Sequence, residues 1–146
     1  MPLTFLKMDN NITISKYSSW KEITILLADD DYSSFILVEE ILSLTNAKLL
    51  YVDNGLDAVN ICKTNNVDLI LMDLKMPKMS GFQATKQIKE LHPNIPIILV
   101  TACALASDID SYKQCGCDDF FSKPVEIDKL VNKIASLLCQ KNINWY

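Results

Sequence analysis

Acidic side chains gather at the end of the first strongly apolar run of the sequence. In the stretch Ile23–Ser34, ITILLADDDYSS, the apolar part ends at the consecutive aspartates Asp29, Asp30 and Asp31. Carboxylates about 4 Å apart repel each other by about 4 kcal/mol at an effective dielectric constant of roughly 20. A hard divalent cation with oxygen ligands relieves this repulsion, and Mg²⁺ is the usual cation beside a phosphate. The cluster therefore predicts a Mg²⁺ site, with a polar turn that carries one helix cap as the alternative.

Polar residues at the ends of later apolar runs supply the other parts of a phosphoryl site. Asp73 follows a run in DLILMDLKMPKMSG, Thr101 ends PIILVT, and Lys123 follows CDDFFS. A cation, a lysine and a hydroxyl around one carboxylate can bind the oxygens of a single phosphoryl group. A carboxylate can also attack phosphorus and form an aspartyl phosphate, and Asp73 is the best candidate because it is single and central. With only three glycines and no glycine-rich loop, a nucleotide site of the P-loop or dinucleotide kind is not expected.

Five short apolar runs alternate with amphipathic stretches along the chain. The runs predict strands at Thr24–Ala28, Lys48–Val52, Leu69–Met72, Ile97–Thr101 and Phe120–Ser122. Apolar residues recur at helical spacing between them, and a weaker fourth helix is predicted from its cap Ser107 to Gly116. This order predicts the α/β class: a doubly wound, five-stranded parallel sheet with strand order 2-1-3-4-5, the (βα)5 flavodoxin-like arrangement. Ligands of such sheets bind beyond the carboxyl ends of the strands, where the candidate residues fall.

The pattern predicts one domain over residues 22–140, with 1–21 as an N-terminal linker or tail and 141–146 as a C-terminal tail. The net charge of −4 and the absence of arginine do not indicate binding to nucleic acid. The longest mostly apolar run, Ile95–Ala106, has 12 residues, too few to span a bilayer, and the N-terminus lacks signal-peptide architecture. We therefore expect a cytoplasmic location, either as a free protein or as the cytoplasmic part of a membrane-anchored sensor kinase. We expect no direct contact of this segment with nucleic acid or membrane.

The cysteines are odd in number, at Cys62, Cys103, Cys115, Cys117 and Cys139. Cys115 and Cys117 flank one glycine, but no second cysteine or histidine pair lies at the spacing of metal ligands. We therefore expect reduced, packed thiols rather than a metal site.

Four motifs together resemble the receiver (CheY-like) domains of two-component signalling. They are LLADDD, LMDLKMPKMSG, LVTA and DDFFSKP, and they follow the order and separations of that family over residues 22–140. The resemblance implies that Asp73 accepts a phosphoryl group from a phosphohistidine, which a histidine kinase or a phosphotransfer domain carries. It implies that the isolated domain catalyses only its own phosphorylation and dephosphorylation.

The resemblance also implies roles for the other residues of the site. Asp30 is expected to bind Mg²⁺ directly and Asp29 largely through water, with the backbone carbonyl of Lys75 as a further ligand beside Asp73. Lys123 is expected to pair with the phosphoryl oxygens, and Thr101 to move and bond the phosphoryl group.

Four further positions can be compared with the family. Phe120 occupies the position of the aromatic switch, where tyrosine is frequent. Pro124 fits the position of a cis proline, and Asp31 is expected to start or cap the first helix rather than to bind metal. Ser80 stands where many members have an aspartate before the glycine, so the loop after the acceptor is less acidic.

The sequence leaves open which kind of protein contains this domain. The segment KYSSWKEITILLADDD is similar to the junction before the C-terminal receivers of hybrid histidine kinases, so we expect part of a hybrid sensor histidine kinase, with a single-domain response regulator as the alternative. A Mg²⁺-dependent phosphohydrolase with an aspartyl nucleophile is a more distant alternative. Such enzymes commonly carry a second acid two residues after the nucleophile, where this chain has Lys75.

Overall fold

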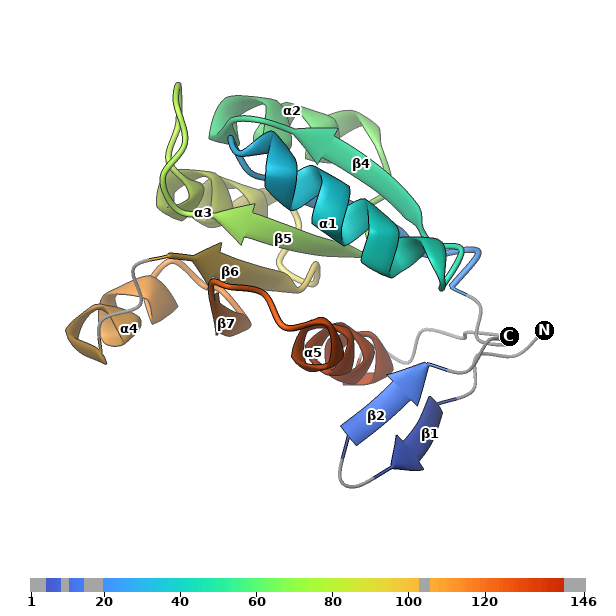
Figure 1. Ribbon diagram of the computed structural model, residues 1–146. Coiled ribbons are helices and arrows are strands. Elements are labelled where there is room, and N and C mark those ends of the chain that lie inside the picture. The colour runs from blue at the N-terminus through green and yellow to red at the C-terminus, as the bar shows by residue number, and fades with distance from the viewer. Residues whose placement is uncertain (1–4, 9–10, 15–19, 103–105, 141–146) are drawn as a thin grey trace.

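A five-stranded parallel sheet forms the centre of the protein (Figure 1). The computed structural model describes residues 5–8, 11–14, 20–102 and 106–140. The strands lie in the order β4-β3-β5-β6-β7, which confirms the predicted order 2-1-3-4-5. Their bounds are β3 Thr24–Ala28, β4 Lys48–Val52, β5 Leu69–Asp73, β6 Ile97–Thr101 and β7 Asp119–Ser122.

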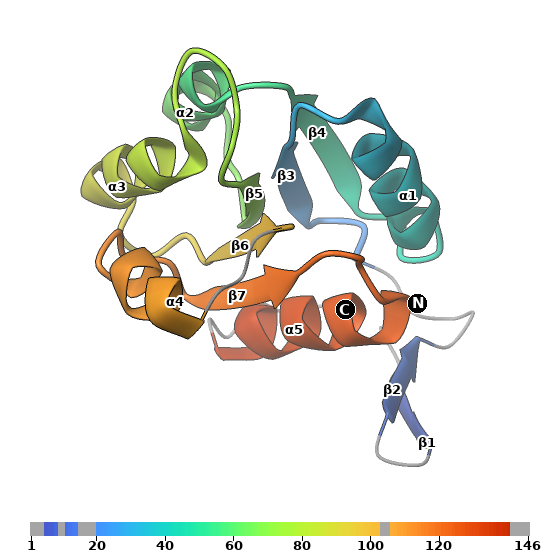
Figure 2. The same ribbon diagram turned by 60° about the vertical axis from the view of Figure 1, so that its left-hand side comes forward.

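Helices cover both faces of this sheet, with α1 and α5 on one side and α2 and α3 on the other (Figure 2). Side chains alternate between the two faces of a strand. Accordingly, Ile25 and Leu27 of β3 pack with α1 and α5, whereas Leu26 and Ala28 pack with α2 and α3. The helices are α1 Tyr32–Ser43, α2 Gly55–Thr64, α3 Gly81–Leu91, α4 Ala106–Lys113 and α5 Ile127–Gln140. None of these helices is both long and apolar enough to cross a membrane.

Several predicted boundaries differ from the structure by one to three residues: β7 starts at Asp119 rather than Phe120, and α4 ends at Lys113 rather than at Gly116. β5 includes Asp73, so the candidate acceptor is the last residue of its strand and not the first residue after it. α4 already includes Ala106, so the prediction that Ser107 caps this helix was wrong. A serine within two residues of a helix start is compatible with several starting positions, because local propensity does not fix the first hydrogen bond.

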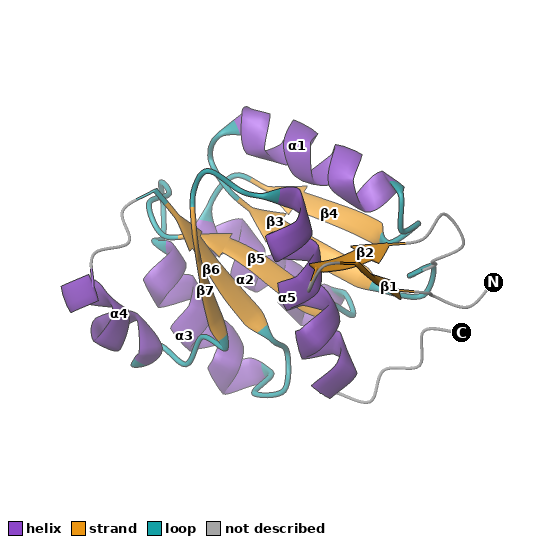
Figure 3. Ribbon diagram, turned by 60° about the horizontal axis from the view of Figure 1, so that its bottom comes forward, coloured by secondary structure: helices purple, strands orange, loops and turns teal. Residues whose placement is uncertain are grey.

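The segment 1–21 contains more structure than the expected linker. β1 Phe5–Met8 and β2 Asn11–Ile14 form an antiparallel hairpin, and β2 contacts α5 (Figure 3). Trp20 is fully buried in the core. Its backbone amide donates to the Thr45 carbonyl, so the packed core extends at least to residue 20. The predicted tail 141–146 lies outside the described residues.

A set of polar contacts joins α3 to the amino ends of β6 and β7. Lys89 Nζ lies 2.6 Å from Asp118 Oδ2 and 2.7 Å from the carbonyl oxygen of Ile95. The same Asp118 oxygen accepts the backbone N–H of Ile97 at 2.8 Å. We call Lys89 and Asp118 the amino-edge ion pair. It holds the end of the sheet that lies away from the candidate site.

Candidate functional site

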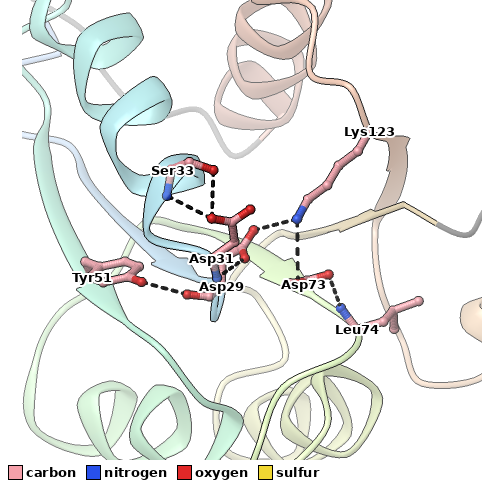
Figure 4. Close-up of polar contacts among 7 residues, drawn as sticks. All are labelled: Asp29, Asp31, Ser33, Tyr51, Asp73, Leu74 and Lys123. Atoms are coloured by element: carbon pink, nitrogen blue, oxygen red, sulfur yellow. Dashed lines mark hydrogen bonds and ion pairs between the residues drawn. The ribbon is translucent and has the colours of Figure 1, made fainter.

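The three predicted metal-binding carboxylates meet at the carboxyl edge of the sheet (Figure 4 shows two of them). Asp29 follows β3 and Asp73 ends β5, and these strands are paired neighbours. One carboxylate oxygen from each of Asp29, Asp30 and Asp73 lies within 4.8 Å of the others. Asp29 and Asp73 are buried, and Asp30 is exposed. Oxygen ligands at this separation fit one hard cation such as Mg²⁺, which takes oxygens at about 2.0–2.1 Å and keeps several waters.

Lys123 reaches this carboxylate group from the end of β7 (Figure 4). Its Nζ lies 2.8 Å from Asp29 Oδ2 and 3.6 Å from Asp73 Oδ2. Burial alone would lower the pKa of Lys123, but the hydrogen bond to Asp29 and the charges of Asp29 and Asp73 raise it. The ammonium group therefore stays charged, and it lies between the two carboxylates where a phosphoryl group would need a positive partner.

Asp73 carries the most perturbed carboxyl group of the site. Burial, followed by the negative charge of Asp29, raises its pKa to about 6. Lys123 and the backbone N–H of Leu74, which donates to Oδ1 at 2.9 Å, act in the opposite direction. One oxygen is thus held by a hydrogen bond, and the other, Oδ2, faces Lys123.

We expect Asp73→Asn to stabilise the protein at neutral pH in a Mg²⁺-free buffer. The pKa of Asp73 is about 6 in the folded protein, whereas an ordinary aspartate has a pKa of 3.8, so wild-type stability falls as pH rises through this interval. A pKa difference of this size corresponds to about 3 kcal/mol, and the partial access of solvent to this carboxylate reduces it to about 1–2 kcal/mol. Urea unfolding of both proteins should show a gain that is near zero at pH 4 and largest above pH 7. A constant difference across this range would contradict the assigned pKa.

Asp31, the last of the three consecutive aspartates, has a different role from Asp29 and Asp30. Asp31 Oδ1 accepts the backbone N–H of Ser33 at 3.0 Å and the Ser33 hydroxyl at 2.7 Å, and these bonds lower its pKa. This confirms the prediction that Asp31 caps the first helix. Its own N–H donates to Asp29 Oδ1 at 2.9 Å, so the start of α1 also orients a candidate metal ligand.

Tyr51 is a supporting residue that the sequence analysis missed. Its hydroxyl donates to the backbone carbonyl of Asp29 at 2.8 Å (Figure 4). The contact depends on the pairing of β3 with β4, in which Leu27 lies opposite Tyr51. A tyrosine in an apolar strand gives no local signal of such a role.

Two glycines allow the loop after Asp73 to close tightly. The N–H of Gly81 donates to the Leu74 carbonyl at 2.8 Å, and the N–H of Gly55 donates to the Met79 carbonyl at 3.1 Å. A Cβ atom on Gly81 would overlap the backbone carbonyl of Asp73, and one on Gly55 would overlap that of Met79. A side chain at Gly81 would therefore displace the acceptor residue itself.

Ser80 begins α3 with a capping box. Its hydroxyl accepts the N–H of Gln83, and the Gln83 side chain accepts the N–H of Ser80. The serine at the position of the family's aspartate thus has a structural use.

The other predicted residues lie at or near the same edge. Thr101 is buried at the end of β6, and its carbonyl accepts the N–H of Lys123 at 2.9 Å. The Lys123–Pro124 bond is cis, as expected. Phe120 stacks on Tyr112 with ring centroids 5.3 Å apart. Lys75 is exposed in the loop after β5. The functional roles of Thr101, Phe120 and the Lys75 carbonyl stay predictions.

Comparisons with known proteins agree with this geometry. Residues 25–135 match the family described as response regulator receiver domain. The polar-differentiation response regulator DivK of Brucella anthropi is 31% identical over 118 residues, which cover 79% of this chain and 95% of that protein.

Two solved receiver domains of histidine kinases have the same fold. The receiver domain of sensor histidine kinase PA1611 from Pseudomonas aeruginosa PAO1, solved with a magnesium ion in its active-site cleft, is 28% identical with a TM-score of 0.75. The match covers 80% of this chain and 98% of that one. The signal receiver domain of a histidine kinase from Syntrophus aciditrophicus is 30% identical with a TM-score of 0.74, and the match covers 80% and 90%.

Proposed function

Because the chain belongs to the family of response regulator receiver domains, we propose that Asp73 accepts a phosphoryl group from a phosphohistidine in a two-component phosphorelay. The observation that carries the proposal is the position of Lys123 Nζ, which lies 2.8 Å from Asp29 and 3.6 Å from Asp73. It joins the reactive carboxylate to the carboxylate cluster that fits Mg²⁺. The donor is a histidine kinase or a phosphotransfer domain.

Transfer needs a free carboxylate oxygen in line with the donor nitrogen. The Leu74 N–H holds Asp73 Oδ1, so we assign the attack on phosphorus to Oδ2. The new O–P bond forms as the P–N bond breaks, and the electron pair of that bond goes to the imidazole nitrogen. Asp29, Asp30, Asp73 and the Lys75 carbonyl would hold Mg²⁺, which would neutralise charge on the phosphoryl oxygens.

The added charge then changes contacts of residues near the end of the sheet. A phosphoryl group brings roughly −2 of charge and strong acceptor oxygens. Lys123 exchanges its contact with Asp29 for a phosphoryl oxygen, and the Thr101 hydroxyl turns to a second oxygen. Phe120 follows this movement and alters the surface formed by α4, β7 and α5.

We expect acetyl phosphate with Mg²⁺ to phosphorylate wild type at Asp73, whereas Asp73→Asn should show no modification. Intact-mass measurement detects the added phosphoryl group, and beryllofluoride serves as a non-covalent mimic. Asp31→Asn is the matched control, because asparagine caps a helix as well as aspartate does. If Asp73→Asn were fully phosphorylated, or if Asp73→Asn and Asp31→Asn lost phosphorylation equally, Asp73 would not be the acceptor.

We expect Mg²⁺ to stabilise wild type and to have little effect on Asp30→Ala. A ligand that binds only the folded state adds RT ln(1 + [Mg²⁺]/Kd), about 2.7 kcal/mol at 100 times Kd. Glu39→Ala removes an exposed acid of α1 and is the control for charge alone. Thermal unfolding with and without Mg²⁺ measures the difference. Equal responses of all three proteins would mean that the aspartates form only a polar turn.

For the parent protein we propose a hybrid sensor histidine kinase in the cytoplasm, with a single-domain regulator as the alternative. The structural relatives from kinases support the first setting, and DivK, which matches over 95% of its length, supports the second. The reading frame upstream of the codon for Met1 distinguishes them. Lys75, at the position of the second acid, argues against a phosphohydrolase.

A further inference from the structure

Two thiols lie together in the turn between α4 and β7. Gly116, with a φ of 92°, reverses the chain between Cys115 and Cys117. The Sγ atoms of both cysteines lie near the carbonyl oxygen of Tyr112, at 2.7 Å for Cys115 and 3.5 Å for Cys117. A shared contact on one oxygen places the two sulfur atoms on the same side of the turn. Neither thiol takes part in the phosphoryl site.

The two thiols differ in their affinity for a proton. A hydrogen bond from Cys117 is the largest influence on Cys115 and lowers its pKa to about 7, although burial opposes the change and Lys89 assists it. The pKa of Cys117 is raised by the same hydrogen bond, by burial, and by the charges of Cys115, Asp118 and Asp119. Cys115 is therefore the thiol of the pair that loses its proton more readily, and a thiolate beside a thiol favours oxidation.

A small reagent reaches the pair from the side of Cys117, whereas Cys115 is buried behind it. Cys117 is half-buried and lines a cavity of about 420 Å³ together with Tyr112, Lys113, Asp118, Asp119 and Phe120. Cys62, which is also a free thiol, is buried as Cys115 is, but no second thiol or cavity is found beside it among the described residues, and burial raises its pKa to about 11. Cys62 thus serves as the internal reference.

We propose that hydrogen peroxide oxidises Cys115 and Cys117 to a reversible disulfide. The Cys115 thiolate attacks one peroxide oxygen, the O–O bond breaks, and hydroxide leaves and takes up a proton. The resulting sulfenic acid is attacked by the Cys117 sulfur, which releases a second water as the S–S bond forms. In total, two thiols and one peroxide give one disulfide and two waters. A ring closed over one intervening residue is strained, so external thiols reduce it readily.

The disulfide connects the redox state of the cell to the switch region. It changes the contacts of both sulfur atoms with the Tyr112 carbonyl, and the Tyr112 ring stacks on Phe120. This consequence rests on the proposed function, whereas formation of the disulfide is independent of it. The primary test therefore measures the sulfur atoms themselves.

The experiment treats the full chain with hydrogen peroxide, then denatures, alkylates and digests it with trypsin. Cleavage after Lys113 and Lys129 releases the peptide 114–129, because the Lys123–Pro124 bond resists trypsin, and this peptide holds both cysteines and no other. We expect it to lose two hydrogens and to carry no alkyl group, and to accept two alkyl groups after dithiothreitol. This reaction should be at least about tenfold faster than oxidation of Cys62.

Two variants assign the steps. Cys117→Ser should leave a sulfenic acid at Cys115 that dimedone traps, and Cys62→Ser should behave as wild type. The proposal is overturned if peptide 114–129 accepts two alkyl groups after peroxide, if Cys62 reacts as fast, or if Cys115 pairs with another cysteine. Since the wild-type measurement alone decides formation of the disulfide, a variant that fails to fold does not remove the test.

Discussion

Replacing Trp20 with alanine should lower the free energy of unfolding by about 3–5 kcal/mol. The side chain is fully buried in the core beside α1 and α5. Removing an indole leaves a cavity that the packed neighbours fill only in part. Urea unfolding followed by far-ultraviolet circular dichroism measures the loss, because this signal does not depend on the tryptophan that is removed.

Leu44→Ala is the control for this prediction. Leu44 follows α1 and is 67% exposed, so its loss should change stability by no more than about 0.5 kcal/mol. If Trp20→Ala were as mild as this control, residues before Ile23 would be a linker after all.

Replacing Gly81 with alanine should both destabilise the fold and impair phosphorylation. The added methyl group meets the backbone carbonyl of Asp73, which cannot rotate away as a side chain would. Overpacking of this kind costs about 1–3 kcal/mol. The relief of the overlap moves Asp73 away from Lys123, so the rate of phosphorylation by acetyl phosphate should fall at least about tenfold, since small displacements of reacting groups have large effects on rate.

Ser80→Ala separates the two effects of this change. It removes the hydroxyl that caps α3, which costs about 1 kcal/mol, but it adds nothing against Asp73. We expect a small loss of stability and a nearly unchanged rate. A Gly81→Ala protein with the rate of Ser80→Ala would show that the loop can shift without moving the acceptor.

The sheet and most of its site were predictable because their signals are local. Strands buried on both faces read as uninterrupted apolar runs, and Asp31 stands directly before the first helical residue, where a cap belongs. The parallel order then placed Asp29, Asp73 and Lys123 at one edge without any knowledge of their side chains.

The features that were missed depend on contacts between distant segments. Trp20 is one apolar residue in a polar stretch, and only its backbone bond to Thr45 and the core around it reveal its role. Tyr51 and Gly81 act on the backbone of Asp29 and Asp73, respectively. The periodicity of a sequence does not predict which distant backbone carbonyl a side chain will contact, or where a carbonyl will lie too close to allow a Cβ atom.

The amino-edge ion pair has a consequence for how a signal crosses the domain. Lys89 and Asp118 join α3 to the beginnings of β6 and β7, whereas Thr101 and Lys123, for which we propose a response to phosphate, lie at or just beyond the opposite ends of these strands. Because a strand that is anchored at its beginning cannot slide along its neighbours, we expect a pull on Thr101 or Lys123 to tilt the strand. We expect the displacement to grow with distance from Asp118 and to be largest at the carboxyl ends of β6 and β7.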